Sequence, residues 1–277
     1  GWELTRREAK ASFANDDIYI EKLIENPRHI EIQILADSLG NVVYLPERDC
    51  SIQRNNQKII EESPSRANSD LLEKMYQSAV MCAKACGYEG TGTVEFIVDK
   101  YDNYYFMEMN TRIQVEYPVT EMVTGINLIK EQIRIASGLP LSVKQEDVAA
   151  NGHAIEVRVN AQNPYDDFRP SCGEISFFLP PGGLDTRFET ALYQGAKILP
   201  FYDSMMAKLI VKGSTRMDAI KKLRRAVSET IIDGVPTNLG FIYAILYDKD
   251  FILGNIDTNY VAHKEAELLE SMHVTGE

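Results

Sequence analysis

The chain has 277 residues, enough for one large or two ordinary domains, and its 44% hydrophobic and 25% charged residues are typical of a folded globular protein. The formal net charge of −12 argues against general binding to nucleic acids or anionic membranes, but it is compatible with local basic pockets for phosphate. No apolar run approaches the roughly 20 residues of a membrane span, and the charged segment TRREAK near the start is unlike a signal peptide.

The N-terminal part of the chain predicts two helices with strands between them. Apolar spacing indicates a strand over Asp17–Ile24, with Ile18, Ile20 and Leu23 as core candidates and Pro27 as its end. The other elements predicted here are a helix over Leu4–Ala14, strands over His29–Ala36 and Val42–Leu45 joined by a turn at Ser38–Asn41, a strand-like Lys58–Ile60, and a helix over Ser69–Cys86 capped by Ser69 or Asp70.

The C-terminal part favours a second unit, with a domain boundary within the polar stretch Leu141–Gly152. His153–Ala161 alternates cleanly and predicts a strand with Glu156, Arg158 and Asn160 on one face. The other predictions are a helix over Asn127–Ser137, a loop over Pro164–Gly173, strands over Ile175–Leu179, Thr186–Phe188 and Met205–Lys212, helices over Arg216–Thr230 and Asn238–Leu246, and a polar tail beyond Val261. The fold class is therefore α+β, a mostly antiparallel sheet with covering helices.

The four cysteines form neither a CxxC motif nor an evenly spaced disulfide framework. Cys82 and Cys86 lie four residues apart on a predicted helix, so we expect them to share a face as small buried apolar residues. The four histidines are too scattered to complete a zinc site. We expect reduced thiols and a cytoplasmic location.

Between these two parts, alternating runs over Val94–Val98 and Tyr105–Met109 predict a β-hairpin. A two-residue loop at Tyr101-Asp102 would place Glu95 directly opposite Glu108. This register groups the remaining side chains by face: Thr93 and Ile97 with Phe106 and Asn110 beside the two acids, and Val94, Phe96, Met107 and Met109 on the core side.

Two carboxylates that face each other across a ladder repel, which is unfavourable in a purely structural sheet. Glu95, Glu108 and Asn110 are instead oxygen ligands of the kind that Mg²⁺ or Mn²⁺ uses when it holds phosphates. The plain alternative is a solvated sheet face whose acids happen to be paired. The residues that follow, Arg112, Gln114 and Glu116, extend the row two by two until Pro118 breaks the ladder, and they favour a metal–phosphate site with an acid–base group beside it.

Several long stretches resemble the biotin carboxylases of the ATP-grasp superfamily. This family includes the biotin carboxylase component of acetyl-CoA carboxylase and the equivalent domains of propionyl-CoA and pyruvate carboxylases. The matching stretches are Glu21–Gln33 (EKLIENPRHIEIQ), Glu47–Glu62 (ERDCSIQRNNQKIIEE), Glu108–Gly125 (EMNTRIQVEYPVTEMVTG), His153–Ala161 and Phe201–Lys208 (FYDSMMAK). The resemblance implies the C-terminal part of an ATP-grasp fold over residues 1–145, a biotin carboxylase C-terminal domain over 146–264, and a polar tail over 265–277.

The family reaction uses MgATP to convert bicarbonate to carboxyphosphate and then carboxylates biotin on a carrier protein. The resemblance therefore implies ATP, Mg²⁺ or Mn²⁺, and biotin as cofactors and bicarbonate as substrate. It implies a biotin carboxyl carrier protein and a carboxyltransferase component as partners, and a homodimer. The reaction would be the first half of an acyl-CoA carboxylation, with acetyl-CoA carboxylase of fatty-acid synthesis as the expected parent.

The family's functional residues transfer onto matching positions. Glu95, Glu108 and Asn110 would hold the metal, Glu116 would be the base for bicarbonate, and Arg158 would stabilise the biotin enolate. Arg112, Gln114 and the Val115 backbone would bind bicarbonate, with Lys58 at the phosphate. The nucleotide would contact Glu21, Lys22, Leu23, Ile24, His29, Gln53, Asn56, Ile97 and Glu108. Without the family, Lys58 could equally be an edge lysine and Arg158 a surface charge.

Two substitutions and one absence set this chain apart from the family pattern. Asn56 and Tyr117 stand where histidines are usual, which weakens a nucleotide contact and alters packing beside Glu116. The N-terminal domain and the glycine-rich part of the lid are missing, so we expect a fragment with little or no turnover alone. The alternatives are another ATP-grasp ligase of the carbamoyl-phosphate synthase type and a non-catalytic module for dimerisation or carrier docking.

Overall fold

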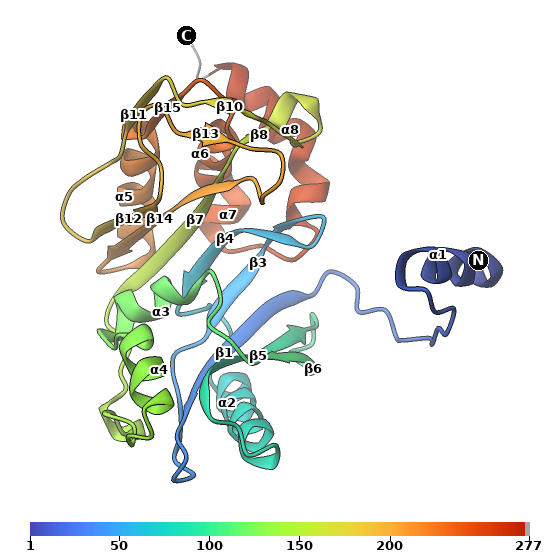
Figure 1. Ribbon diagram of the computed structural model, residues 1–277, viewed down its shortest axis with the longest axis vertical. Helices are drawn as coiled ribbons and strands as arrows, with labels where there is room; N and C mark the ends of the chain where they lie inside the picture. The colour runs from blue at the N-terminus through green and yellow to red at the C-terminus, as the bar shows by residue number, and fades with distance from the viewer. Residues whose placement is uncertain (275–277) are drawn as a thin grey trace.

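The computed structural model describes residues 1–274, and its centre is one large antiparallel sheet (Figure 1). The strands run in the order β12 (Thr186–Thr190), β14 (Met205–Gly213), β7 (His153–Asn160), β4 (Gln57–Ser63), β3 (Arg48–Arg54), β1 (Arg28–Ala36), β5 (Gly90–Val98) and β6 (Tyr104–Asn110), with β2 (Val42–Tyr44) paired to β1. Three small two-stranded sheets accompany it: β8 (Gln162–Asn163) with β9 (Arg169–Pro170), β10 (Gly173–Glu174) with β13 (Lys197–Ile198), and β11 (Phe177–Leu179) with β15 (Ile231–Asp233).

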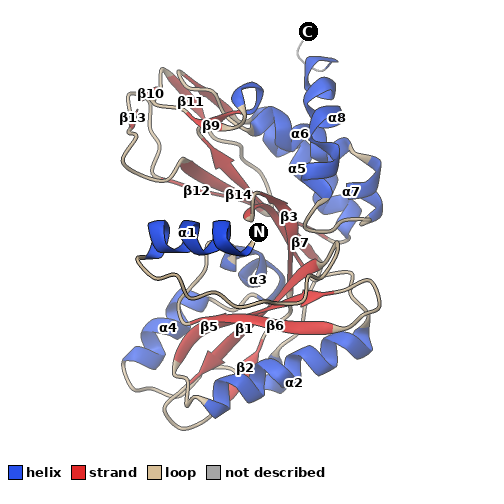
Figure 2. Cartoon of the chain, turned by 90° about the vertical axis from the view of Figure 1, so that its right-hand side faces the viewer, coloured by secondary structure: helices blue, strands red, loops and turns tan. Residues whose placement is uncertain are grey.

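Helices cover the two ends of the sheet separately (Figure 2). The α2 helix lies along the β1–β5 end, where Met75 and Ala79 pack against Ile32 and Phe96 in one apolar core. Helices α5, α6 and α8 cover the β7–β14 end and enclose a second, larger core. The helices are α1 (Trp2–Phe13), α2 (Ser69–Ala85), α3 (Tyr117–Thr124), α4 (Leu128–Ala136), α5 (Arg216–Glu229), α6 (Leu239–Tyr247), α7 (Lys249–Leu253) and α8 (Tyr260–Val274), with 3-10 turns at Gln145–Asp147 and Pro164–Asp166. Among the described residues, no helix has the length and apolar character needed to cross a membrane.

The α+β prediction is confirmed, and the strands at the centre of the sheet follow the sequence closely. The predicted strands at His29–Ala36, His153–Ala161 and Met205–Lys212 correspond to β1, β7 and β14 within a residue at each end. These segments alternate in sequence or are rich in β-branched residues, and such residues fit a half-buried pleated surface. The predicted helices at the α4, α5 and α6 positions are confirmed with similar bounds.

The predicted strand at Asp17–Ile24 is wrong. The helix α1 ends at Phe13, Ala14 after it has a left-handed backbone, and the chain then runs as an irregular segment to β1. Ile20 and Leu23, expected in the core, are 86% and 81% exposed. Figure 1 shows this segment and α1 extending away from the rest of the chain, so no neighbouring strand is there to pair with it.

Several local predictions also differ from the structure. Asn68, rather than Ser69 or Asp70, caps α2 by accepting a hydrogen bond from the Asp70 backbone. Cys86 is exposed, not buried, because it lies past the last turn of that helix. The polar tail predicted at 265–277 is helical as far as Val274, with Leu268 packed in the core, and residues 275–277 lie outside the described part of the chain.

The β5–β6 hairpin confirms that Glu95 faces Glu108, but by a different route from the one predicted. The turn is longer than two residues, since the Asp99 backbone bonds with that of Asn103 and Asp102 has a positive φ. A register shift after Glu95 compensates for the extra residue. Ile97 consequently pairs with Tyr105 instead of lying beside Phe106, and Met107, expected in the core, is 43% exposed.

Candidate functional site

Polar side chains from four strands and three connecting segments converge on a cleft of about 500 Å³ near the middle of the sheet. The site loop, residues 111–116, joins β6 to α3, and the other two segments are the β3–β4 turn and the residues just before β14. The side chains lining the cleft include most of the predicted site: Asn56, Lys58, Glu95, Glu108, Asn110, Arg112, Gln114, Val115, Glu116 and Arg158. A larger cleft of about 660 Å³ lies between α6 and α8, but none of the predicted site residues lines it.

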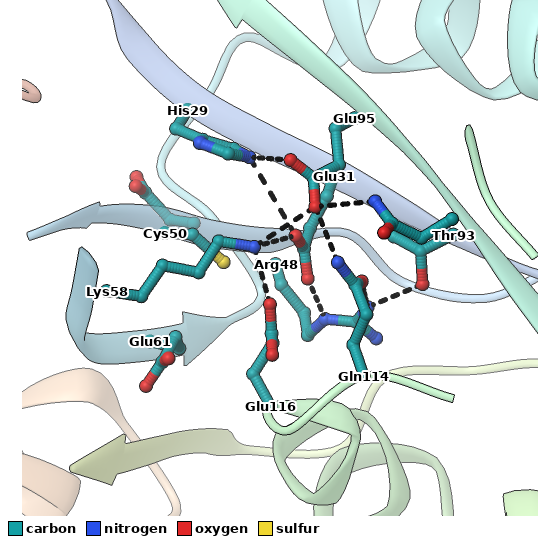
Figure 3. Close-up of polar contacts among 12 residues, drawn as sticks. His29, Glu31, Arg48, Cys50, Lys58, Glu61, Thr93, Glu95, Gln114 and Glu116 are labelled. Carbon is teal, nitrogen blue, oxygen red and sulfur yellow. Dashed lines mark hydrogen bonds and ion pairs between the residues drawn. The ribbon is translucent and has the colours of Figure 1, made fainter. Parts of the chain in front are cut away.

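Lys58 is the centre of the charge network (Figure 3). Its Nζ atom lies 2.7 Å from Glu31 Oε2, 2.5 Å from Glu116 Oε1 and 3.2 Å from Glu95 Oε1. Burial disfavours the charged amine, but the surrounding carboxylates outweigh burial, so the pKa of Lys58 is raised. Lys58 is thus a permanently charged group at the floor of the cleft.

Arg48 is fully buried beneath this network and holds it in place. Its Nε atom donates to Glu31 Oε1 at 2.5 Å, and its Nη2 atom donates to Gln114 Oε1 at 3.2 Å. Further hydrogen bonds run from the same guanidinium to Gln33, Thr93 and Thr120. A rigid fork of five donors therefore joins β1, β5 and α3 to the site loop.

Glu95 and Glu108 lie side by side at the rim, with Asn110 between them. The Asn110 Nδ2 atom donates to Glu95 Oε1 at 3.1 Å and to Glu108 Oε1 at 2.9 Å. Gln114 Nε2 donates to Glu95 Oε1 at 2.5 Å, and His29 Nε2 lies 2.9 Å from Glu95 Oε2. Burial raises the pKa of Glu95, but these contacts and the Lys58 charge outweigh it and lower the pKa to about 2. Glu95 is therefore an anion at neutral pH.

Glu116 stands between two of the cations that line the cleft, Lys58 and Arg158. Its Oε1 atom accepts from Lys58, and its Oε2 atom accepts from Arg158 Nη2 at 3.1 Å. Arg158 is anchored in turn by Glu61, whose Oε1 atom accepts from its Nε atom at 2.6 Å. The neighbouring Val115 carbonyl accepts from Lys208 Nζ at 2.8 Å, which fixes the backbone of the loop. The Glu116 carboxylate is thus flanked by two positive charges.

Arg112 and the predicted residues that do not line the cleft lie in three places. Arg112 is exposed at the rim, with Nη1 donating to the Ile113 carbonyl. Gln53 lies behind the cleft in contact with His29, and Ile97 on β5 pairs with His29 on the adjacent strand β1. The segment Glu21–Ile24 belongs to the irregular N-terminal stretch, and the structure does not bring it to the cleft.

Sequence reasoning missed the buried supporting groups Glu31, Arg48, Glu61 and Glu156. Glu31 lies two residues after His29 on β1, so the period-two pattern placed both on one face and could have identified it. Arg48 begins β3 inside a charged segment with no periodicity, and its burial depends on partners far along the chain.

Comparison with known proteins agrees with this geometry. A family model described as the carbamoyl-phosphate synthase L chain ATP-binding domain matches residues 2–144, and one described as the biotin carboxylase C-terminal domain matches residues 156–263. Biotin carboxylase 1 of Bacillus subtilis is 55% identical over 263 residues, which cover 94% of this chain and 58% of that protein. The chain belongs to the biotin carboxylase family. Chloroplastic biotin carboxylase of Arabidopsis thaliana is 50% identical, over 98% of this chain and 51% of that protein.

Solved biotin carboxylase structures have the same fold. The biotin carboxylase domain of a thermophilic 2-oxoglutarate carboxylase bound to bicarbonate matches with a TM-score of 0.92 at 46% identity, covering 96% of this chain and 60% of that one. A β,γ-ATP complex of biotin carboxylase from Campylobacter jejuni matches with a TM-score of 0.90 at 44% identity, covering 95% and 58%. The chain spans little more than half the length of the biotin carboxylases it matches.

Proposed function

We propose that this chain carries the bicarbonate-activating and biotin-positioning site of a biotin carboxylase. The reaction is the MgATP-dependent conversion of bicarbonate to carboxyphosphate, followed by carboxylation of biotin on a carrier protein. The observation that carries the proposal is the convergence of Lys58 and Arg158 on the two oxygens of Glu116. One carboxylate between two cations suits a site that must hold an oxyanion and accept its proton.

The cleft offers bicarbonate a complete set of partners. Bicarbonate is a planar oxyanion, and a guanidinium such as that of Arg112 can hold it through two parallel hydrogen bonds. Gln114 and the Val115 backbone line the same cleft. Glu116 would accept the hydroxyl proton, and the oxygen so freed would attack the terminal phosphorus of ATP, with ADP as the leaving group. Lys58 would neutralise charge that develops on the phosphoryl oxygens.

The donor set at the rim fits a hard divalent cation. Glu95 is ionised, Glu108 is exposed beside it, and the Asn110 amide bridges both, so a cation and a rotated amide oxygen could take the place of the bridging N–H group. Such ligands suit Mg²⁺ or Mn²⁺. When bound, the metal would neutralise charge on the phosphates and help to orient them for transfer.

Arg158 is proposed to stabilise the enolate form of the biotin ureido group. Its Nη2 atom faces the cleft beside Glu116 while its Nε atom is held by Glu61, so the guanidinium presents one donor edge in a fixed direction. A cation at the ureido oxygen makes the neighbouring nitrogen a better nucleophile. The Asn160 side chain on the next outward position of β7 lines the same part of the cleft.

The partners and the nucleotide contacts stay predictions. A homodimer is expected because one similar solved structure, the biotin carboxylase domain of Hydrogenobacter thermophilus 2-oxoglutarate carboxylase, is described as a dimer in complex with MgADP, ADP and bicarbonate. The carrier, the carboxyltransferase component and the acetyl-CoA acceptor follow from the family resemblance alone. A relative from Methanothermobacter thermautotrophicus that is named as part of a pyruvate carboxylase is 49% identical, so the degree of similarity does not select the acceptor.

The test is bicarbonate-dependent ATP cleavage with free biotin and Mg²⁺, on a sample shown to be folded by circular dichroism. The chain is measured alone and together with the part of the Bacillus subtilis relative that it does not match. We expect little turnover alone and biotin-dependent turnover in the mixture. Glu116→Gln should abolish it, with Glu270→Gln, an exposed position far along α8, as the matched control. Cleavage stimulated by ammonia or glutamine rather than biotin would contradict the proposal.

A further inference from the structure

Two fully buried glutamates face each other behind Arg158. Glu61 on β4 and Glu156 on β7 are directly opposite in the antiparallel ladder, and both are 0% exposed. Residues opposite each other in a ladder share a face of the sheet. Ile210, opposite Glu156 on β14, packs against Val119 and Val123 of α3, so the carboxyl pair lies on the face that α3 covers.

This pair has too few donors for two anions. Glu61 Oε1 accepts from Arg158, but Glu61 Oε2 and both oxygens of Glu156 are buried without a hydrogen-bond partner among residues 1–274. The other charged groups that act on Glu156 are Lys208 and Glu116. Lys208 is already committed to Glu189 at 2.7 Å and to the Val115 carbonyl, and Glu116 is an acid itself. An isolated buried carboxylate costs far more than a neutral carboxyl group.

We propose that Glu61 and Glu156 share a single proton, carried by Glu156, and that the resulting monoanion is the positioning device for Arg158. The neutral Glu156 leaves the Glu61 charge wholly available to Arg158 Nε. The Glu61–Glu156 pair touches neither substrate nor metal in this scheme and acts only through the guanidinium. The catalytic half of the proposal rests on the proposed function, whereas the shared proton does not.

The direction of both titrations agrees with this assignment. Burial raises the pKa of Glu156 well above its usual range, and the adjacent Glu61 charge raises it further. Burial also raises the pKa of Glu61, to about 7, although Arg158 opposes the rise. The carboxyl that contacts the guanidinium therefore ionises first, as in other pairs of carboxyl groups that cannot both be charged.

The arrangement explains how Arg158 can serve a reaction in which Glu116 changes its charge. Two carboxylates hold the guanidinium, Glu61 at Nε and Glu116 at Nη2. When Glu116 takes up a proton, its hold on Arg158 weakens. Glu61 keeps its charge because Glu156 stays neutral, so the guanidinium stays oriented toward the cleft through the carboxylation step.

The shared proton is tested without any turnover. A protonated carboxylic acid has an infrared carbonyl stretch that a carboxylate lacks. The folded chain at pH 8 should show this band, Glu156→Gln should remove it, and the exposed-position variant Glu270→Gln should leave it unchanged. A band that persists in Glu156→Gln, or that is absent from the parent chain, overturns the proposal.

Positioning is tested on the same samples by the Nε–H resonance of Arg158, identified by its loss in Arg158→Lys. Glu156→Gln keeps a neutral group of the same shape, so the resonance should stay in place. Glu61→Gln should shift it and speed its exchange with water, and Glu61→Asp, which retains the charge, should restore part of the protection. Equal effects of Glu61→Gln and Glu156→Gln would mean that the pair is only structural.

Activity then completes the test in the reconstituted mixture described above. Glu61→Gln should lower the turnover of biotin carboxylation on the order of 10- to 100-fold with little change in the KM for ATP, because a misplaced catalytic group costs rate. Glu156→Gln should stay within about 2-fold of the parent from pH 7 to 9. If Glu156→Gln loses activity like Glu61→Gln, the neutral assignment fails. If the parent mixture itself is inactive, the proposed function fails. The infrared and resonance tests still decide whether Glu156 carries the proton.

Discussion

Strand β4 carries one buried glutamate on each face, and the pKa values of these two glutamates are shifted in opposite directions. On the face toward α5, Glu62 accepts from Arg216 at 2.6 Å and 3.1 Å, and lies 2.7 Å from His153 Nε2. On the other face, the adjacent Glu61 meets another carboxyl group, Glu156, and only one guanidinium. Both residues of β4 are almost completely buried, yet contacts with His153 and Arg216 outweigh burial and lower the pKa of Glu62 to about 2, whereas burial raises that of Glu61 to about 7.

The comparison of Glu61 with Glu62 shows that burial alone does not determine the charge of a carboxyl group. The number of donors within hydrogen-bond reach decides it. The α5 face is saturated with donors and serves to join β4 to the C-terminal helices. On the site face of β4, Glu61 accepts one hydrogen bond, from Arg158, and Glu156 opposite it accepts none from the described residues. Saturation marks the structural side of the strand, and the deficit marks the functional side.

The largest expected effect is on the saturated face. Arg216→Met removes the bidentate partner of Glu62 and the donor to the Phe251 and Ile252 carbonyls. Because the buried Glu62 charge then keeps only His153 as its partner among the contacts described above, we expect the free energy of unfolding to fall by about 3–5 kcal/mol. Urea unfolding measures it, with Arg225→Met, an exposed helix position, as the control near zero. A loss below about 1 kcal/mol would remove the basis of the comparison.

Acid should act mainly through the carboxylates that have several donors, which are Glu62 on the α5 face and Glu31 and Glu95 in the cleft. The pKa values of Glu31, Glu62 and Glu95 are about 2, below the ordinary 4.5. A lowered pKa contributes stability that is present above pH 4.5 and lost as pH falls toward 2. We expect unfolding free energy to fall by about 2 kcal/mol or more between pH 5 and 3. Glu62→Gln should flatten this slope, and an unchanged slope in that variant would count against the assignment.

Glu156 should show the opposite sign. A carboxyl group whose folded pKa is raised gives the folded state more bound protons than the unfolded state, so stability falls as pH rises above 4.5. Glu156→Gln removes this cost, and we expect it to be more stable than the parent by about 1 kcal/mol or more at pH 8, with the difference shrinking toward pH 4. Thermal unfolding across this range measures it. A destabilised variant at pH 8 would show that Glu156 works as an anion.

The smallest expected effect on stability is that of a substitution at the rim of the cleft. Glu108 is exposed, so Glu108→Gln should change the unfolding free energy by less than about 0.5 kcal/mol. The same variant should weaken Mn²⁺ binding at least about 10-fold if this carboxylate is a ligand. Titration calorimetry with Mn²⁺ gives the affinity, and Glu89→Gln, another exposed acid near the sheet, should leave it unchanged. Equal affinities in all three proteins would place the metal elsewhere.

The sequence predicted features that depend on local periodicity. Strand β1, strand β7 and the facing pair Glu95–Glu108 follow from alternation, because side chains two apart share a face whatever the rest of the fold does. The facing pair came out correctly although the predicted turn was too short, since the later bulge restored the register.

The sequence did not predict two local features whose signals were ambiguous, or the features that depend on distant partners. The β3–β4 turn rests on Asn55 and Asn56, both with positive φ, in a segment that seemed only charged. Helix α3 begins at the residue before Pro118, a position that favours a helix start as readily as a strand end. The Glu61–Glu156 pairing joins segments far apart in the chain, and no local pattern encodes it. Ile20 and Leu23 seemed apolar enough for a core, but no partner covers them.

The β4–β7 ladder also affects how the protein unfolds. It joins strands from the two segments that separate family models match, inside one continuous sheet. Breaking this ladder would expose Ile60 and Val157 to water and would separate Glu61 from Arg158. Segments that separate family models match therefore need not be separate cooperative units, and amide protons of β4 and β7 should exchange together in a single opening event.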